Sequence, residues 1–152
     1  MIQRIQTVFL LGTVVSLVIM IFLPLAEILT NEGIYYTAYS SGIEKEGGEV
    51  VYPTLPVLIL VVVIAVMSLI NIFLFRNRKL QIRLSVYGII LSFGIIGLLY
   101  YYRVVLFREI DVDSYWLKLP LILPLAAIIF TYLAFRGIRK DEILIRSIDK
   151  LR

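Results

Sequence analysis

The chain has 152 residues, of which 61% are hydrophobic and 17% are charged, whereas soluble domains average about 45–50% apolar and about 25% charged residues. This composition indicates an integral membrane protein, and the length leaves room for a single domain, residues 1–152. The sequence contains no cysteine and no histidine, which excludes disulfides, thiolate nucleophiles and histidine-based metal sites.

Four stretches are apolar over about the 20 residues that a helix needs to cross a bilayer. They lie at about residues 8–26, 55–75, 82–101 and 117–135. The first is longer than the core of a secretion signal, which has about 7–15 residues. It also ends in Pro24-Leu25-Ala26, which lacks the small-x-small cleavage pattern, so we expect a retained helix. Pro120 and Pro124 are expected to kink the fourth span or to mark its start.

The first outer loop, residues 27–54, is the only sizeable polar segment between spans. Residues 34–39 and 49–52 are rich in strand-forming types, and Ser41-Gly42 and Gly47-Gly48 bracket a charged turn between them. We therefore predict a short β-hairpin. An isolated hairpin is marginal in water, so it needs support from the second outer loop, the membrane surface or a partner. The acidic residues of these loops lack the spacing of a calcium loop, and we expect no metal site.

Basic residues are divided unequally between the two sides of the predicted spans. Eleven lie on the side of the two termini and of the link between the second and third spans, and four lie on the other side. Cytoplasmic segments carry the excess of Lys and Arg. We therefore predict that both termini are cytoplasmic.

Small and polar residues recur at helical spacing within the spans, where they let helices approach closely. The candidate helix-packing residues are Gly12, Ser16, Ser68, Asn71, Ser85, Gly88 and Ser92. Asn71 is the most polar of them and is expected either to hydrogen-bond a neighbouring helix or to bind a ligand. No ionisable residue lies in the middle of a span, which disfavours proton-coupled pumps.

The tail, residues 136–152, is predicted to form an amphipathic cytoplasmic helix after a break at Gly137, with Leu144, Ile145 and Ile148 on its apolar face. It and the basic link between spans two and three supply the candidate partner- or lipid-binding residues. These are Arg76, Arg78, Lys79, Arg83, Arg139, Lys140, Leu144, Ile145 and Ile148. Anionic lipids attract such charges. Aromatic interleaving and a nucleic-acid-binding fold are missing, so we predict no nucleic-acid partner.

The predicted fold is thus an all-α membrane protein. It is a bundle of four transmembrane helices with a short β-hairpin in the first outer loop and a C-terminal amphipathic cytoplasmic helix.

Three segments on the predicted cytoplasmic side resemble one known family. They are Met1-Ile2-Gln3-Arg4-Ile5-Gln6-Thr7, Arg78-Lys79-Leu80-Gln81-Ile82-Arg83-Leu84 and residues 138–152. They are similar to the domain-of-unknown-function 4293 family of small four-span inner-membrane proteins of the Bacteroidota. The resemblance implies a multi-pass protein of the bacterial inner (cytoplasmic) membrane and supplies no activity, cofactor or catalytic residue. In shape alone, the architecture also resembles claudin-like four-helix proteins with an outer hairpin, whose extracellular Trp and Cys signature is absent.

We expect a non-enzymatic scaffold or accessory subunit of an inner-membrane complex, in contact with membrane lipids and with a protein partner on its cytoplasmic face. The alternative is a transporter or handler of a small molecule or lipid that works without a buried carboxylate, in a groove near Asn71, Gln81 and Ser92. An enzyme is not expected, because no catalytic constellation stands out, and no cofactor is predicted. The oligomeric state stays open.

Overall fold

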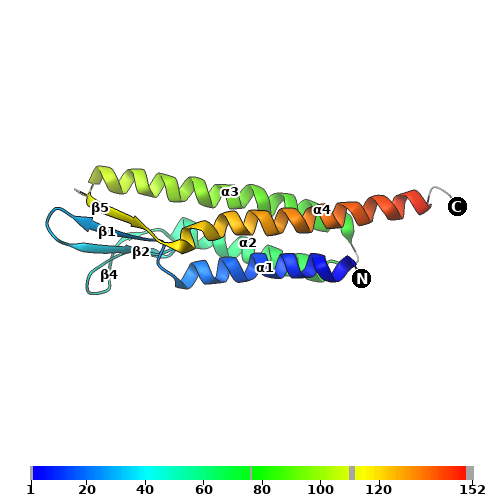
Figure 1. The fold of residues 1–152 in the computed structure, drawn as a ribbon, viewed down its shortest axis with the longest axis horizontal. Coiled ribbons are helices and arrows are strands. Elements are labelled where there is room, and N and C mark those ends of the chain that lie inside the picture. Colours follow the sequence, from blue (N-terminus) through cyan, green and yellow to red (C-terminus); the bar gives the residue numbers. More distant parts are fainter. Residues whose placement is uncertain (1, 76, 110–111, 150–152) are drawn as a thin grey trace.

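The computed structural model describes residues 2–75, 77–109 and 112–149. Figure 1 shows an elongated molecule in which four long helices lie side by side and a β-sheet stands at one end. The elements are, in chain order, α1 (Ile2–Phe22), β1 (Ala26–Thr30), β2 (Tyr35–Ala38), β3 (Gly42–Lys45), β4 (Glu49–Pro53), α2 (Leu55–Phe73), α3 (Arg78–Glu109), β5 (Val112–Leu117), η1 (Leu119–Ile122) and α4 (Leu123–Asp149). The start of α1 and the end of α4 lie at the end of the bundle away from the sheet. We call it the terminal end, and the other the sheet end.

The helices form a ring in which α1 packs on α2 and α4, and α3 packs on the same two neighbours. Its centre is apolar. The largest side chains with no exposed surface there are Leu17, Met20, Val57, Val61, Ile64 and Ile95. Because lipid tails are as apolar as these side chains, their burial stabilises the bundle through close packing rather than through removal from water.

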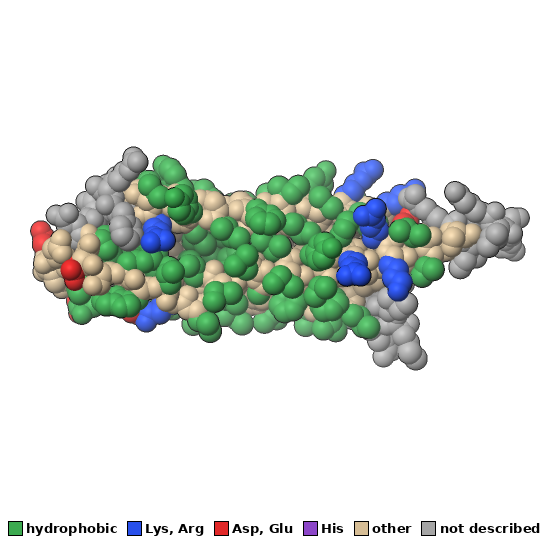
Figure 2. Space-filling view, turned by 45° about the horizontal axis from the view of Figure 1, so that its top comes forward, with side chains coloured by type: hydrophobic (Ala, Val, Ile, Leu, Met, Phe, Trp, Pro, Cys, Tyr) green, Lys and Arg blue, Asp and Glu red, His purple; other side chains and the backbone are tan. Residues whose placement is uncertain are grey.

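Much of the apolar surface points outward from the bundle. In each apolar helix window, 33% or fewer of the residues are buried inside the protein, and Phe22 and Phe73 are each 75% exposed. Figure 2 shows a hydrophobic belt along the bundle, with Lys and Arg side chains gathered at the terminal end and most acidic ones at the sheet end. Within the described residues, four helices are long and apolar enough to cross a membrane, as in a multi-pass membrane protein.

The prediction of an all-α fold with one hairpin is wrong. The protein has a five-stranded antiparallel sheet with the strand order β4-β3-β2-β1-β5. The two strands expected from composition overlap β2 and β4, but they do not pair with each other. Instead β3 lies between them, with Thr37 opposite Glu44 and Ile43 opposite Tyr52. The charged segment that was predicted as a turn lies mostly in strand β3. Its residue Ile43 is buried in the centre of the sheet, which favours the extended conformation.

Long-range pairing completes the sheet and ties it to the bundle. Strand β5, from the loop after α3, pairs with β1, so that Ile28 lies opposite Tyr115. The Lys118 Nζ lies 2.8 Å from Glu27 Oε2, next to that pair. Ile28 and Ile43 are 0% and 1% exposed and form the apolar centre of the sheet. The segment between α3 and α4 therefore supplies the support that a lone hairpin lacks.

The tight turn between β3 and β4 depends on glycine. Gly47 and Gly48 have φ angles of +114° and +85°, in a region that glycine enters without steric cost. The sequence predicted these two glycines as one boundary of a charged turn, whereas they lie in the turn itself, between β3 and β4.

The break predicted at Gly137 does not occur, because α4 runs without interruption from Leu123 to Asp149. Its start follows the short 3-10 turn η1, and Pro124 is its second residue, where a missing N–H group costs little. The predicted amphipathic helix is the last part of α4, which projects past the ends of the other helices (Figure 1). A glycine in a helix costs only about 0.5–1 kcal/mol. The close packing of Gln6 against Gly137 offsets that cost.

Candidate functional site

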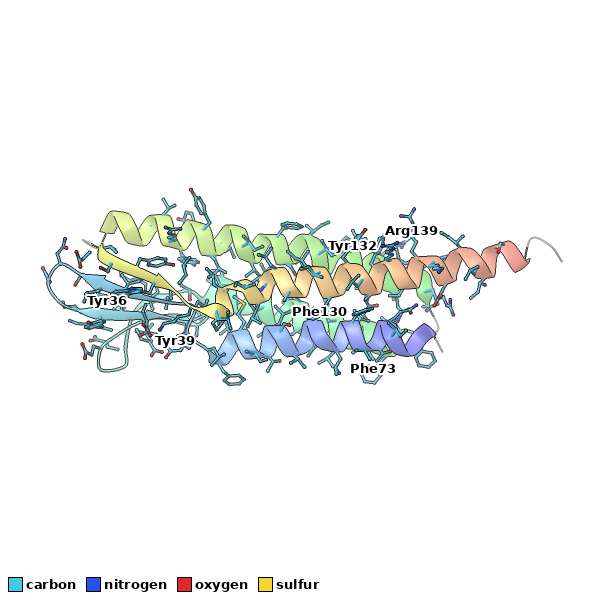
Figure 3. All side chains as sticks on the ribbon, viewed as in Figure 1. Tyr36, Tyr39, Phe73, Phe130, Tyr132 and Arg139 are labelled. Carbon is cyan, nitrogen blue, oxygen red and sulfur yellow. The ribbon has the colours of Figure 1, made fainter. Side chains whose placement is uncertain are left out.

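The predicted partner- or lipid-binding residues that the structure describes lie together at the terminal end. They are Arg78, Lys79, Arg83, Arg139, Lys140, Leu144 and Ile145. All except Arg78 are exposed, and Arg139 points away from the bundle in Figure 3. Arg76 and the side chain of Ile148 lie outside the described part of the chain.

Arg78 turns inward to a buried carboxylate that sequence reasoning missed. Its Nη1 lies 3.8 Å from Oδ2 of Asp141, and the side chains of the two are 20% and 10% exposed. The same oxygen accepts a 2.6 Å hydrogen bond from Nε2 of Gln6. This polar group connects α1, α3 and α4, and the hydrogen bond and the nearby guanidinium offset the cost of burying a charge.

Gly137 makes this contact possible. A Cβ atom on Gly137 would lie 3.0 Å from Cγ and 3.3 Å from Nε2 of Gln6, closer than ordinary packing allows. The glycine that seemed to break the helix is therefore the place where α1 approaches α4 closely enough for Gln6 to reach Asp141.

The inward face of α4 follows a regular spacing of three and four residues, as packed helices do. Its members are Ala127, Thr131, Ala134, Ile138 and Asp141, each at most 8% exposed. We call this row the α4 stripe. Extending this spacing past Gly137 in the sequence would have predicted that Asp141 is buried. The next positions of the same spacing are Leu144, Ile145 and Ile148, in the last part of α4.

A second polar group joins α2 to α3. Asn71 donates a 2.9 Å hydrogen bond from Nδ2 to Oγ of Ser85, which in turn donates to the backbone oxygen of Gln81 at 2.9 Å. The side chain of Gln81 donates a 2.8 Å hydrogen bond to the backbone oxygen of Asn71, near the end of α2. These three side chains are 1–7% exposed, and their contacts are with one another. Among the described residues, Oδ1 of Asn71 is the buried side-chain atom without a hydrogen-bond partner.

The other candidate packing residues lie at helix contacts. A Cβ atom on Gly12 would meet the Phe130 ring of α4 at 3.3 Å (Figure 3), and one on Gly88 would lie 3.6 Å from Thr131. Ser16 and Ser92 donate to the carbonyl four residues back in their own helices, and Ser68 is 5% exposed. Thr13 and Thr131 approach each other across the α1–α4 contact at 3.1 Å, a pair that sequence reasoning did not single out.

A groove at the sheet end was also missed. It has a volume of about 260 Å³ and lies between α3, β5, η1 and α4. Its lining is apolar apart from Arg103 and the hydroxyls of two tyrosines. The Arg103 guanidinium carbon lies 5.1 Å from the ring centre of Tyr115, a favourable cation–π distance. Burial raises the pKa of the Tyr115 phenol, and the Arg103 charge opposes that rise.

The family model "Domain of unknown function (DUF4293)" matches residues 2–151 of the chain. The chain belongs to the DUF4293 family. The match spans all four helices and the sheet of this DUF4293 member, and it confirms the resemblance drawn from the two ends and the link. No curated protein matches the sequence.

The polar side chains of this DUF4293 chain do not converge on one reactive centre. Within residues 2–75, 77–109 and 112–149, no group of three or more Asp, Glu, His or Cys side chains is placed to hold a metal ion. The two buried polar groups bind neighbouring helices, whereas exposed features gather at the projecting end of α4 and in the sheet-end groove. These two places are the candidate sites for binding.

Proposed function

We propose that this protein is a non-enzymatic scaffold or accessory subunit of a complex in the bacterial inner membrane. In this proposal both termini are cytoplasmic, and the projecting end of α4 binds the protein partner. The family membership carries no activity, so the proposal rests on the surface of the molecule itself.

The observation that carries the proposal is the continuation of the α4 stripe beyond the bundle. Up to Asp141 the stripe is covered by the other helices. One turn later, Leu144 and Ile145 are 47% and 41% exposed. The basic residues Arg139 and Lys140 stand beside them and are also exposed. The inward face of α4 is thus packed along most of its length and exposed at its end. A partner helix could pack against this exposed end, as an amphipathic helix binds in a hydrophobic groove.

The charge distribution supports the orientation. Exposed basic side chains stand at the terminal end, and Glu32, Glu46 and Glu49 are exposed near the turns of the sheet. By the positive-inside rule, we assign the terminal end to the cytoplasm in this proposal. Because the chain has no cysteine, single-cysteine variants test this directly. A membrane-impermeant maleimide applied from outside should label Glu46→Cys and spare Ser147→Cys until the membrane is opened; the reverse pattern would invert the topology.

The alternative of a transport path near Asn71, Gln81 and Ser92 has less support. Those side chains are 0–7% exposed and hydrogen-bond to one another or to their own helix. Their polar groups hold α2 and α3 together, so we do not place a substrate among them.

The partner-binding proposal is tested with a pair of double variants. The protein is purified from native membranes in a mild detergent, and each co-purifying protein is quantified. Replacing Leu144 and Ile145 with serine should lower a stoichiometric partner at least tenfold. Replacing Val50 and Val51 with serine is the matched control, because these side chains are 53% and 40% exposed at the opposite end, and the partner should be retained.

Two results would overturn the proposal. One is recovery of the same partner with the Leu144 and Ile145 variant. The other is a crosslinking result: a photoreactive residue at position 144, in an otherwise unchanged protein in native membranes, yields only lipid adducts. The maleimide pattern described above checks that each variant keeps its topology.

A further inference from the structure

We propose that the sheet-end groove binds one acyl chain of an anionic membrane phospholipid, whose phosphate pairs with Arg103. This inference is independent of the partner on α4, because the groove lies at the other end of the molecule.

The walls of the groove are suited to an acyl chain. Ile96, Leu99 and Tyr100 come from α3, and Leu121 and Leu125 come from η1 and the start of α4. Tyr115 and Leu117 lie two residues apart on β5, so their side chains share one face of the strand. The volume of about 260 Å³ is slightly below the range of about 300–1,000 Å³ that is usual for small-molecule pockets. The groove thus holds part of a chain rather than a whole lipid.

The groove opens onto the apolar surface of the bundle. Tyr100, Leu117 and Leu125 line it and are still 67%, 56% and 49% exposed. On the face drawn in Figure 2, the surface near the sheet end is hollowed and mostly hydrophobic. An acyl chain can therefore lie in the groove while its other parts stay in the surrounding bilayer.

Arg103 is the one charged side chain in the described lining of the groove. It lies seven residues after Ile96, about 10 Å further along α3 toward the sheet at 1.5 Å per residue. The charge thus stands at the polar end of an apolar groove, as the phosphate does in a phospholipid. Guanidinium groups bind phosphate in a bidentate manner.

Tyr115 helps to hold that charge in place. The Arg103 guanidinium lies over its ring at 5.1 Å. A tyrosine phenol is neutral near pH 7, so Tyr115 does not cancel the positive charge. Charge complementarity therefore favours an anionic headgroup over a zwitterionic one.

Native mass spectrometry of the detergent-purified protein tests the inference. Phosphatidylglycerol and phosphatidylcholine with identical chains are added in competition. We expect the wild type to retain one phosphatidylglycerol in preference, and Arg103→Gln to reduce that preference about fivefold or more, the effect expected for one basic side chain at an anionic lipid surface. Leu125→Trp, which fills the apolar part, should lower the binding of both lipids.

Lys118→Gln is the matched control. Lys118 is a basic residue at the same end and is bound to Glu27, but it does not line the groove. Its variant should keep the preference for phosphatidylglycerol. Equal retention of the two lipids by the wild type, an equal loss in Lys118→Gln and Arg103→Gln, or unchanged binding by Leu125→Trp would each overturn the inference. Unfolding midpoints of all variants show that the proteins compared are folded.

Discussion

Replacing Gly137 with alanine should destabilise the protein, even though alanine favours a helix. In a helix interior, the exchange by itself stabilises by about 0.5–1 kcal/mol. Here the new methyl group would lie 3.0 Å from Cγ of Gln6, so Gln6 must move. We predict that this movement breaks its 2.6 Å hydrogen bond to Asp141.

The magnitude follows from the two opposing effects. A hydrogen bond to a charged group contributes about 1.5–3 kcal/mol. Subtracting the helix gain leaves an expected loss of about 0.5–2.5 kcal/mol in the free energy of unfolding. In a Gln6→Ala background the steric conflict and the hydrogen bond are both absent, so Gly137→Ala should there stabilise by about 0.5–1 kcal/mol.

Unfolding of the detergent-solubilised protein by a denaturing detergent, followed by far-ultraviolet circular dichroism, measures these values. Gly97→Ala is the matched control in α3, because a Cβ atom there would meet no atom within 4 Å, and we expect no loss. The reasoning is refuted if Gly137→Ala behaves like Gly97→Ala in the wild-type background. It is equally refuted if the loss is the same with and without Gln6.

Two further predictions concern the second polar group and the sheet. Gln81→Leu leaves the backbone oxygen of Asn71 without its 2.8 Å hydrogen bond and should cost about 1–3 kcal/mol. Asn71→Leu removes the hydrogen bond to Ser85 together with the unpartnered Oδ1, and Ser85 still donates to Gln81, so it should cost less, about 0.5–1.5 kcal/mol. The same unfolding assay ranks the two variants, and a larger cost for Asn71→Leu would contradict this account. Because the pKa of Tyr115 is raised from 10.0 in the folded protein, the unfolded state loses that proton first, and folded stability falls as pH rises above about 10. Tyr115→Phe should therefore lose less stability than the wild type between pH 9 and 12, as measured by Tm; parallel Tm curves would remove this assignment.

The predicted binding residues show which parts of the two candidate sites could be predicted from the sequence. Lys79, Arg83, Arg139 and Lys140 were found because surface charge is visible residue by residue, and the structure gathers them at one end. Asp141 was not among the predicted residues. Its burial depends on α4 continuing through Gly137, which in turn depends on the fit of Gln6 from the opposite end of the chain.

The sheet shows the same division. Composition located β2 and β4, but the strand between them carries charges, and its partner side chains decide that it is extended. Strand β5 is separated from β1 by α2, α3 and the rest of the sheet. No local sequence pattern predicts that Ile28 pairs with Tyr115. Neither the fifth strand nor the groove beside it could therefore be inferred from the sequence.

The sequence by itself determined the four apolar helices, the excess of basic residues on one side and the family. Each of these properties is a sum over neighbouring residues, such as the hydropathy of about 20 positions or a count of charges. Only the tertiary structure decided the strand order, the continuous α4, the buried Asp141 and the sheet-end groove. Those features depend on pairs of residues far apart in the chain, such as Gln6 and Asp141, whose contact free energy is realised only when the fold brings them together.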